Sequence, residues 1–314
     1  MTEHQAAHPA HARAEAPEYW HLAAGRTLSL KVPRLMAVIN CTPDSFHAAS
    51  RAASVDQAVQ HSLQAVEDGA HLLDIGGEST RPGAEPVDAD EQIRRVVPVI
   101  EAIRTQRGDA GTIPISVDTT QSRVADAALK AGADAVNDVS GGLDDPSILG
   151  VVAQHRAGLI VMHRLTAPEC DSYSDAYAAP PKYESVVDAV IARLSTSTRL
   201  AQEAGVETGH ILWDPGLGFG KGLPDTLELL AATPRLAGQG FGVLSALSRK
   251  SCVGRLSLGR DAEPSERLWG TLAMSTLHLS MGARVFRVHD VAAHREALNA
   301  AWAVLTGQSE APAM

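Results

Sequence analysis

The chain of 314 residues has little of several features that mark common protein classes. It has no basic excess: 27 lysines and arginines against 37 acidic residues give a formal net charge of -10. This charge argues against a general nucleic-acid or anionic-membrane partner, because such partners select a basic surface. No apolar run approaches the roughly 18 residues that cross a bilayer, and the N-terminus lacks the apolar core of a signal peptide. We therefore expect a cytoplasmic protein with no membrane or nucleic-acid partner.

Cysteine is also scarce. Cys41, Cys170 and Cys252 are odd in number and show no Cys-x-x-Cys spacing, which argues against a disulfide framework and against a zinc site. The rest of the composition, 45% hydrophobic and 20% charged, is that of an ordinary globular domain with a large core.

Eight short apolar runs are the main feature of the chain, and each of them ends at a polar or charged residue. Short runs that are partly β-branched and are followed by turn-forming residues are typical of strands buried on both faces, as in a parallel sheet. The runs cover residues 35–39, 72–73, 113–117, 135–136, 159–162, 211–213, 241–247 and 285–288, and they end at Asn40, Asp74, Asp118, Asn137, His163, Asp214, Ser248 and His289.

Stretches with helical spacing alternate with these strands. In residues 90–104, for example, Ile93, Val96 and Ile100 recur at intervals of three and four, and glycine follows several of the stretches. The expected helices span residues 55–68, 90–104, 122–131, 146–155, 182–204, 226–236, 264–281 and 292–305.

Eight strand–helix units predict the α/β fold known as the (β/α)8 or TIM barrel, in which chemistry takes place at the carboxyl ends of the strands. One polar residue at a strand end is equally well explained as part of a turn, since Asp, Asn and Ser favour turns. Eight of them, which a barrel would bring to one rim, predict an active site.

The first residues stand apart from this pattern. Residues 1–17 are rich in Ala and His without periodicity, and we expect them to be a disordered leader before a single barrel domain over residues 18–314. Residues 20–22 and 27–30 flank Ala-Ala-Gly, which predicts an N-terminal β-hairpin that closes the barrel floor.

Seven motifs with polar or glycine-rich sequences follow one another along the chain. Together they closely resemble dihydropteroate synthase, a family of pterin-binding enzymes, from about residue 18 to the C-terminus. The motifs are NCTPDSF at 40–46, DIGGESTRPG at 74–83, SVDT at 116–119, NDV at 137–139, DPGLGFGK at 214–221, SRKS at 248–251 and RVHDV at 287–291.

The resemblance implies a transferase of folate biosynthesis with two small-molecule substrates. In this reaction, 4-aminobenzoate displaces pyrophosphate from 6-hydroxymethyl-7,8-dihydropterin pyrophosphate and gives 7,8-dihydropteroate. A pterin has an edge of N–H donors, and a buried carboxylate can accept two of them. The resemblance assigns this edge to Asp214, with Asn137 and Asp118 beside it, and it assigns the ring carbonyl to Lys250. Met162 and Phe219 complete this part of the site.

The same resemblance implies catalytic roles for Asp118, Asp214 and Lys250. If the C–O bond to pyrophosphate breaks before the amine attacks, positive charge develops on the methylene group, and a fixed carboxylate would stabilise it. No strong general base is then required.

The leaving group requires positive charge and N–H donors. Arg287 and His289 alternate along one expected strand, so both side chains point the same way, and a guanidinium fits phosphate oxygens well. The resemblance adds Asn40 to this pyrophosphate site as the ligand of a Mg²⁺ ion. Because Mg²⁺ keeps several waters and takes phosphate oxygens, one protein ligand is sufficient.

Two segments, residues 42–51 and 79–87, contain Pro, Ser and Gly and few apolar residues, which predicts mobile covers over the barrel mouth. The resemblance implies that they close on the substrates through Phe46, Thr80, Arg81 and Pro82. Ser251 would begin a short helix whose free N–H groups favour the carboxylate of 4-aminobenzoate.

The chain departs from the family pattern at some positions, and these departures leave alternatives open. Residues 47–51 read HAASR where the family usually has Ser-Asp-Gly-Gly, and Ala246 replaces a usual Gly. The alternatives are a catalytically altered paralogue that binds pterin and a methyltransferase of the methyltetrahydrofolate type. Members of the family are commonly dimers, so we expect a homodimer formed through the last two helices.

Overall fold

The eight expected strands form one closed parallel barrel in the computed structural model, which describes residues 17–41, 48–174, 176, 177, 179 and 181–308. Consecutive strands pair with each other, and the last strand closes the ring against the first. The (β/α)8 prediction is confirmed. The strands are β3 (Arg34–Asn40), β4 (Leu72–Gly76), β5 (Ile115–Asp118), β6 (Ala135–Asp138), β7 (Gly158–Met162), β8 (Ile211–Asp214), β9 (Gly242–Ser245) and β10 (Val285–Val288).

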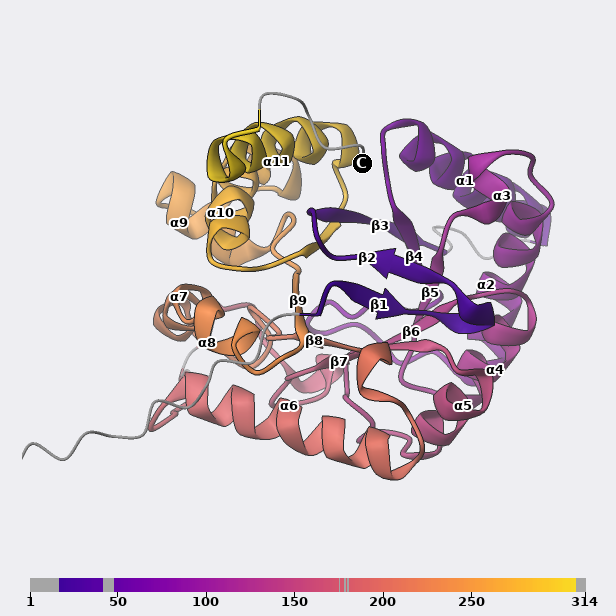
Figure 1. Ribbon diagram of the computed structural model, residues 1–314, viewed down its shortest axis with the longest axis horizontal. Coiled ribbons are helices and arrows are strands. Elements are labelled where there is room, and N and C mark those ends of the chain that lie inside the picture. The colour runs from indigo at the N-terminus through magenta and orange to yellow at the C-terminus, as the bar shows by residue number, and fades with distance from the viewer. Residues whose placement is uncertain (1–16, 42–47, 175, 178, 180, 309–314) are drawn as a thin grey trace, which may run out of the picture.

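Helices surround this barrel on its outer side (Figure 1). None of the helices in the described part of the chain is long and apolar enough to cross a membrane. The helices are α1 (Ala48–Glu67), α2 (Ala89–Arg104), α3 (Asp109–Thr112), α4 (Ser122–Lys130), α5 (Ser147–His155), α6 (Val186–Glu203), α7 (Leu223–Ala231), α8 (Thr233–Ala237), α9 (Ser251–Leu258), α10 (Leu268–Ser280) and α11 (Val291–Thr306).

Several helix ends differ from those expected. α1 begins at Ala48, because the alanine-rich residues that follow are strong helix formers, so residues 48–51 do not belong to the expected loop. α6 begins at Val186, where Ser185 caps the first turn by accepting a hydrogen bond from the N–H of Asp188. The helix expected over residues 226–236 is divided into α7 and α8, because Pro234 has no N–H to continue the first helix. Residues 264–267 form a 3-10 turn before α10.

The expected strand ends also need one correction that bears on the site. Asp74 does not end its strand: β4 continues to Gly76, which pairs with Asp118 of β5. Asp74 therefore lies one level below the rim, opposite Ser116, and its side chain is completely buried.

Alternation along the strands separates two cores. Residues of one parity, such as Leu73 and Phe286, pack outward in one hydrophobic cluster with the surrounding helices. Residues of the other parity, such as Leu72 and Val285, form a second cluster inside the barrel. Further along the same strands, the inward positions are polar, with Asp74 above Leu72 and Arg287 above Val285. The barrel interior is therefore apolar near the floor and polar near the mouth.

The N-terminal hairpin closes the apolar end, as predicted. Its strands β1 (Tyr19–His21) and β2 (Thr27–Ser29) pair antiparallel and lie in front of the barrel strands in Figure 1. Trp20 belongs to the inner cluster and donates a 2.7 Å hydrogen bond from Nε1 to the carbonyl of His210, next to the start of β8. The expected leader lies almost wholly outside the described residues, which begin at residue 17.

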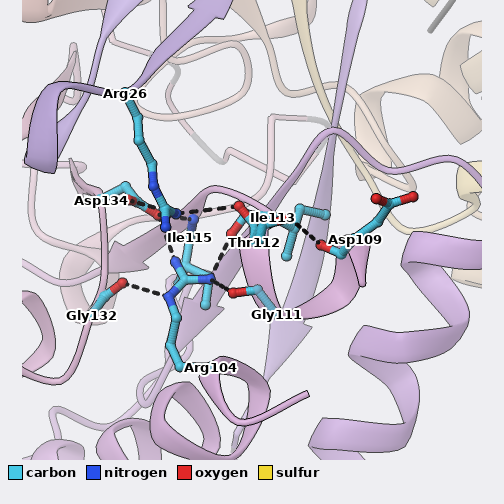
Figure 2. Close-up of polar contacts among 9 residues, drawn as sticks. All are labelled: Arg26, Arg104, Asp109, Gly111, Thr112, Ile113, Ile115, Gly132 and Asp134. Carbon is cyan, nitrogen blue, oxygen red and sulfur yellow. Dashed lines mark hydrogen bonds and ion pairs between the residues drawn. The ribbon is translucent and has the colours of Figure 1, made fainter. Parts of the chain in front are cut away.

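A buried carboxylate joins the hairpin to the neighbouring elements (Figure 2). Asp134, just before β6, accepts a 2.6 Å hydrogen bond from Arg104 of α2 and a 2.8 Å hydrogen bond from the N–H of Ile115, and it forms an ion pair with Arg26 of the hairpin at 3.2 Å. Because these contacts lie at the amino-terminal end of the barrel, they support the fold and take no part in the rim.

Candidate active site

A cavity of about 490 Å³ opens at the carboxyl ends of the barrel strands. It is lined by every described residue that sequence analysis assigned to substrate, pyrophosphate or metal. Phe46, the remaining predicted residue, lies outside the described residues. The predicted residues in the wall are Asn40, Thr80, Arg81, Pro82, Asp118, Asn137, Met162, Asp214, Phe219, Lys250, Ser251, Arg287 and His289.

Three hydrogen-bond acceptors from three strands of the barrel form the inner wall of the cavity. Asp118, Asn137 and Asp214 end or nearly end β5, β6 and β8, and all three are buried. Oδ1 of Asp214 accepts a 2.7 Å hydrogen bond from the N–H of Gly216, which fixes the carboxylate. Burial raises the pKa of Asp214, and nearby Lys250 opposes this effect. The wall suits a ligand edge that is rich in N–H groups.

Arg287 crosses the barrel interior and holds two carboxylates together. Its Nε lies 2.6 Å from Oδ2 of Asp74, and its Nη2 lies 2.6 Å from Oδ2 of Asp118. Burial raises the pKa of Asp118 to about 7; Arg287 opposes this rise and the charge of Asp74 adds to it. Burial works against the charge on Arg287, but the two carboxylates hold the pKa of this guanidinium above its ordinary value. Arg287 is therefore a fixed cation, with only part of its guanidinium left for an anion.

Lys250 lines the same cavity, near Asp214, and its side chain is held by two contacts. Its ammonium donates a hydrogen bond to the carbonyl of Leu217 and lies 4.4 Å from the ring centroid of Phe219. Burial lowers the pKa of Lys250 to about 8, and Asp214 opposes the shift. Cation–π contact of this kind holds both side chains in one arrangement.

His289 forms the other part of the predicted anion site together with Ser248. The Ser248 hydroxyl accepts a 3.1 Å hydrogen bond from the backbone N–H of His289, and it lies 3.0 Å from Nδ1 of the same residue. Burial lowers the pKa of His289 to about 4, so the ring is neutral near pH 7. Because the hydroxyl can donate its proton to Nδ1, we assign the ring proton to Nε2, where it serves as a donor to an anion.

Sequence analysis did not identify the contacts that hold Lys250 and His289 in place. Arg249, between Ser248 and Lys250, has a left-handed backbone with φ of 59°, which costs about 1–2 kcal/mol for a residue other than Gly. Its Nε donates a 2.9 Å hydrogen bond to Asp290, in a bidentate ion pair that joins the β9 and β10 loops. Arg267 donates a 2.6 Å hydrogen bond to the Arg249 carbonyl. The sequence contains one signal for the Arg249–Asp290 pair: Arg249 lies in the SRKS motif and Asp290 in the RVHDV motif.

Lys221 is a second residue whose role sequence analysis missed. It is 0% exposed, and Nζ donates hydrogen bonds to the carbonyls of Gly216 and Phe219 at 2.8 and 2.9 Å. Nδ1 of His163 lies 2.9 Å from the same atom. Burial lowers the pKa of Lys221 to about 7. Lys221 shapes the glycine-rich loop after β8 and thus places Phe219 under Lys250.

Hydrogen bonds at both ends hold the loop over residues 79–87, the second of the two segments predicted to cover the barrel mouth. Glu78 accepts a 2.6 Å hydrogen bond from the N–H of Val87 and a 2.9 Å hydrogen bond from Gln92 of α2. The N–H of Gly83 donates to the carbonyl of Pro168 at 2.9 Å, which connects this loop to the long segment after β7. The loop presents Thr80, Arg81 and Pro82 to the cavity from these fixed points.

Ser251 begins α9, as expected, and lines the cavity. Asn40, at the end of β3, is exposed at the same cavity as Arg287 and His289. Among the residues that the structure describes, no group of three or more His, Cys, Asp or Glu could hold a metal ion. The exposed side chain of Asn40 offers one amide oxygen, a donor type that fits a Mg²⁺ ion held mainly by substrate phosphates and water.

Comparisons with known proteins agree with this arrangement. The profile of the family described as pterin binding enzyme matches residues 36–289. Dihydropteroate synthase of Bacillus subtilis (strain 168) is 41% identical over 257 residues, which cover 82% of this chain and 83% of that protein.

Two solved structures of Xanthomonas albilineans dihydropteroate synthase are also similar. The structure with 4-aminobenzoic acid is 42% identical with a TM-score of 0.79 and covers 91% of this chain and 98% of that chain. The complex with 7,8-dihydropteroate is 38% identical with a TM-score of 0.77, and it covers 92% of this chain and 98% of that chain. The chain belongs to the dihydropteroate synthase family of pterin-binding enzymes.

Proposed function

We propose that this cavity joins 6-hydroxymethyl-7,8-dihydropterin pyrophosphate to 4-aminobenzoate, which releases pyrophosphate and gives 7,8-dihydropteroate. The chain is accordingly a transferase. The observation that carries the proposal is one cavity whose wall combines the acceptors Asp118, Asn137 and Asp214 with Arg287 and neutral His289. The similar Xanthomonas albilineans enzyme has been solved with one of these substrates and with this product.

The proposed pterin site uses the acceptor wall and Lys250. The carboxylates of Asp118 and Asp214 and the amide oxygen of Asn137 accept N–H groups of the pterin edge, and the Lys250 ammonium donates to the ring carbonyl. Phe219 and Met162 cover the ring. The amine substrate lies toward Thr80, Pro82 and Ser251, where the first N–H groups of α9 favour its carboxylate.

The C–O bond between the pterin methylene and pyrophosphate breaks first, and both bonding electrons leave with the pyrophosphate. The fixed carboxylates Asp118 and Asp214 stabilise the positive charge that develops on the methylene and the ring. The amine nitrogen then forms the new C–N bond and loses a proton to water. Arg287 and His289 donate hydrogen bonds to the departing pyrophosphate.

Mg²⁺ belongs to the proposal as the metal of this reaction, with Asn40 as its protein ligand. When bound, it neutralises negative charge on the pyrophosphate. We also propose a cytoplasmic location, and a homodimer in which α10 and α11 meet a second copy. Both helices expose large apolar side chains, including Trp269 at 78% and Val304 at 84%.

The proposal predicts turnover by the purified wild-type chain with the pterin pyrophosphate, 4-aminobenzoate and Mg²⁺. Dihydropteroate and pyrophosphate are measured by chromatography. Lys250→Ala and Arg287→Ala are each expected to lower kcat/KM by about 100-fold or more, since each removes a charged contact to the substrate.

Gly150→Ala, on the outer helix α5 with open space at the new methyl group, is the matched control and is expected to keep full activity. A wild-type chain that binds the pterin substrate but forms no dihydropteroate would contradict the proposal and favour the altered paralogue.

A further inference from the structure

Beneath the substrate wall lies a carboxylate that does not line the cavity. Asp74 is 0% exposed, and its Oδ2 atom accepts two hydrogen bonds from residues that do line it: 2.6 Å from Nε of Arg287 and 3.1 Å from Nδ2 of Asn137. The two partners come from β10 and β6, while Asp74 comes from β4. One buried oxygen atom thus connects a residue of the proposed pyrophosphate site with a residue of the proposed pterin site.

The contact with Asn137 determines which end of its amide meets the ligand. Because Nδ2 donates to Asp74, the Oδ1 atom is turned away from that carboxylate, and it has no hydrogen-bond partner among the described residues although it is buried. A buried acceptor without a partner costs free energy until a donor reaches it. Asn137 is therefore set to accept an N–H from a ligand, as the pterin edge requires.

The contact with Arg287 determines which edge of the guanidinium remains available. Nε is bound to Asp74 and Nη2 to Asp118, and no described residue forms a hydrogen bond with Nη1. A guanidinium held along one edge by two carboxylates can turn only its far end toward a phosphate oxygen. The same contact leaves Arg287 able to hold Asp118 in the acceptor wall.

We propose that Asp74 is a positioning residue for the reaction, which orients Asn137 toward the pterin and Arg287 toward both Asp118 and the pyrophosphate. It does not touch the substrates. This inference rests on the proposed function, because the two oriented residues are those assigned to the pterin and the leaving group.

The test compares Asp74→Asn with the wild type in the full reaction. The amide keeps the shape of the carboxylate but removes its charge. It also offers an NH₂ group in a position where Arg287 and Asn137 both donate hydrogen bonds. We expect kcat/KM for the pterin pyrophosphate to fall about 10- to 100-fold, the usual cost of losing a residue that orients ligand-binding groups. KM for 4-aminobenzoate should change less than twofold, since that substrate does not meet Asn137 or Arg287.

A second readout separates positioning from mere support of the fold. Loss of the Asp74 charge removes a neighbour that raises the pKa of Asp118, so the acidic limb of the kcat/KM profile should move to lower pH. If Asp74→Asn does not fold, Asp74→Ser is used instead. Its hydroxyl is too short to reach both partners, and we expect the same kinetic pattern.

Asp134→Asn is the matched control, because Asp134 is also a buried carboxylate that binds two arginines but lies at the barrel floor (Figure 2). It should lower the melting temperature and leave both KM values and the pH profile unchanged.

An Asp74 variant with unchanged kinetics for the pterin substrate, or one with an equal loss for both substrates and an unmoved acidic limb, would overturn the inference. In either case an active wild type leaves the proposed function intact, whereas an inactive wild type refutes the proposed function itself.

Discussion

We expect two groups of opposite charge, buried Asp118 and partly buried Lys250, to set the pH range in which the free enzyme works. In the proposed reaction, Asp118 must be ionised to accept an N–H and to stabilise a cation, and Lys250 must be protonated to donate a hydrogen bond. Burial raises the pKa of Asp118 to about 7, with Asp74, Glu78 and Asp138 adding to the rise and Arg287 opposing it. Burial lowers the pKa of Lys250 to about 8, where Asp214 opposes the shift and Arg287 adds to it.

We therefore predict a bell-shaped profile of kcat/KM for the pterin pyrophosphate, with limbs near pH 7 and pH 8. Activity falls below the first limb as Asp118 is protonated and above the second as Lys250 loses its proton. Initial rates at subsaturating pterin substrate from pH 5 to 10 check this, and Lys250→Arg should abolish the basic limb. A flat profile over this range would exclude both assignments.

Ionisation of Asp118 also affects the free energy of unfolding. It should raise activity, but it lowers stability. Its folded pKa lies above the ordinary value of 3.8, so between about pH 4 and 7 the folded chain binds more protons than the unfolded chain. The contribution of Asp118 to stability is therefore present at low pH and is lost as the pH rises toward 7. The protonated form of Asp118 favours the fold, whereas the proposed reaction uses the ionised form.

At the scale of elements, the barrel separates a supporting end from a reacting end. Gly158 begins β7 below the hairpin, and a Cβ atom there would lie 2.7 Å from the ring of Trp20 and 2.8 Å from Leu22. The hairpin packs on the floor because this position has no side chain. The polar end of the same strand, at Met162, lines the cavity.

We predict that Gly158→Val destabilises the chain by about 1–3 kcal/mol, the usual cost of overpacking, while kcat and both KM values stay within twofold. Urea unfolding and steady-state kinetics on the same preparation measure the two effects. Gly150→Ala is the control: a Cβ there meets open space within α5, so it should be neutral or slightly stabilising. A large change in KM of Gly158→Val without loss of stability would contradict the prediction, because the amino-terminal end of the barrel would then affect the site at the carboxyl-terminal end.

At the scale of the whole molecule, the last helices carry the apolar surface of the proposed dimer. Trp269 of α10 and Val304 of α11 are more exposed than large apolar side chains usually are in a monomer, and Leu277 of α10 is 53% exposed. A second copy that covers these side chains would remove their apolar surface from water.

We predict that the wild type has twice the mass of one 33.0 kDa chain by light scattering, and that the double variant Trp269→Glu with Val304→Glu has the mass of a monomer. A charge at the centre of an apolar interface opposes its burial. Leu227→Glu, an exposed leucine on α7, should leave the mass unchanged. A wild-type monomer at micromolar concentration would refute the dimer.

The sequence by itself determined the order of strands and helices and the identity of the residues at the rim, because hydrophobic period and strand-ending polar residues are local features. Asn40, Asp118, Asn137 and Asp214 could be found in this way, and the resemblance supplied the roles of residues such as Lys250. Helix boundaries do not follow from the apolar period alone: α1 begins at Ala48, where alanines extend the helix without an apolar period to mark it.

Only the tertiary structure decided how these residues act on one another. The sequence predicts that Asp74 ends its strand, but the strand continues past it, and the barrel brings Asp74 to Arg287, which is 213 positions away in the chain. In the sequence Lys221 is the last residue of a glycine-rich motif, and in the fold its buried Nζ donates the hydrogen bonds that shape this loop. Contacts between residues so distant along the chain leave no periodic pattern in the sequence, because closure of the barrel creates them. Burial in the closed barrel then shifts the pKa values of the site residues.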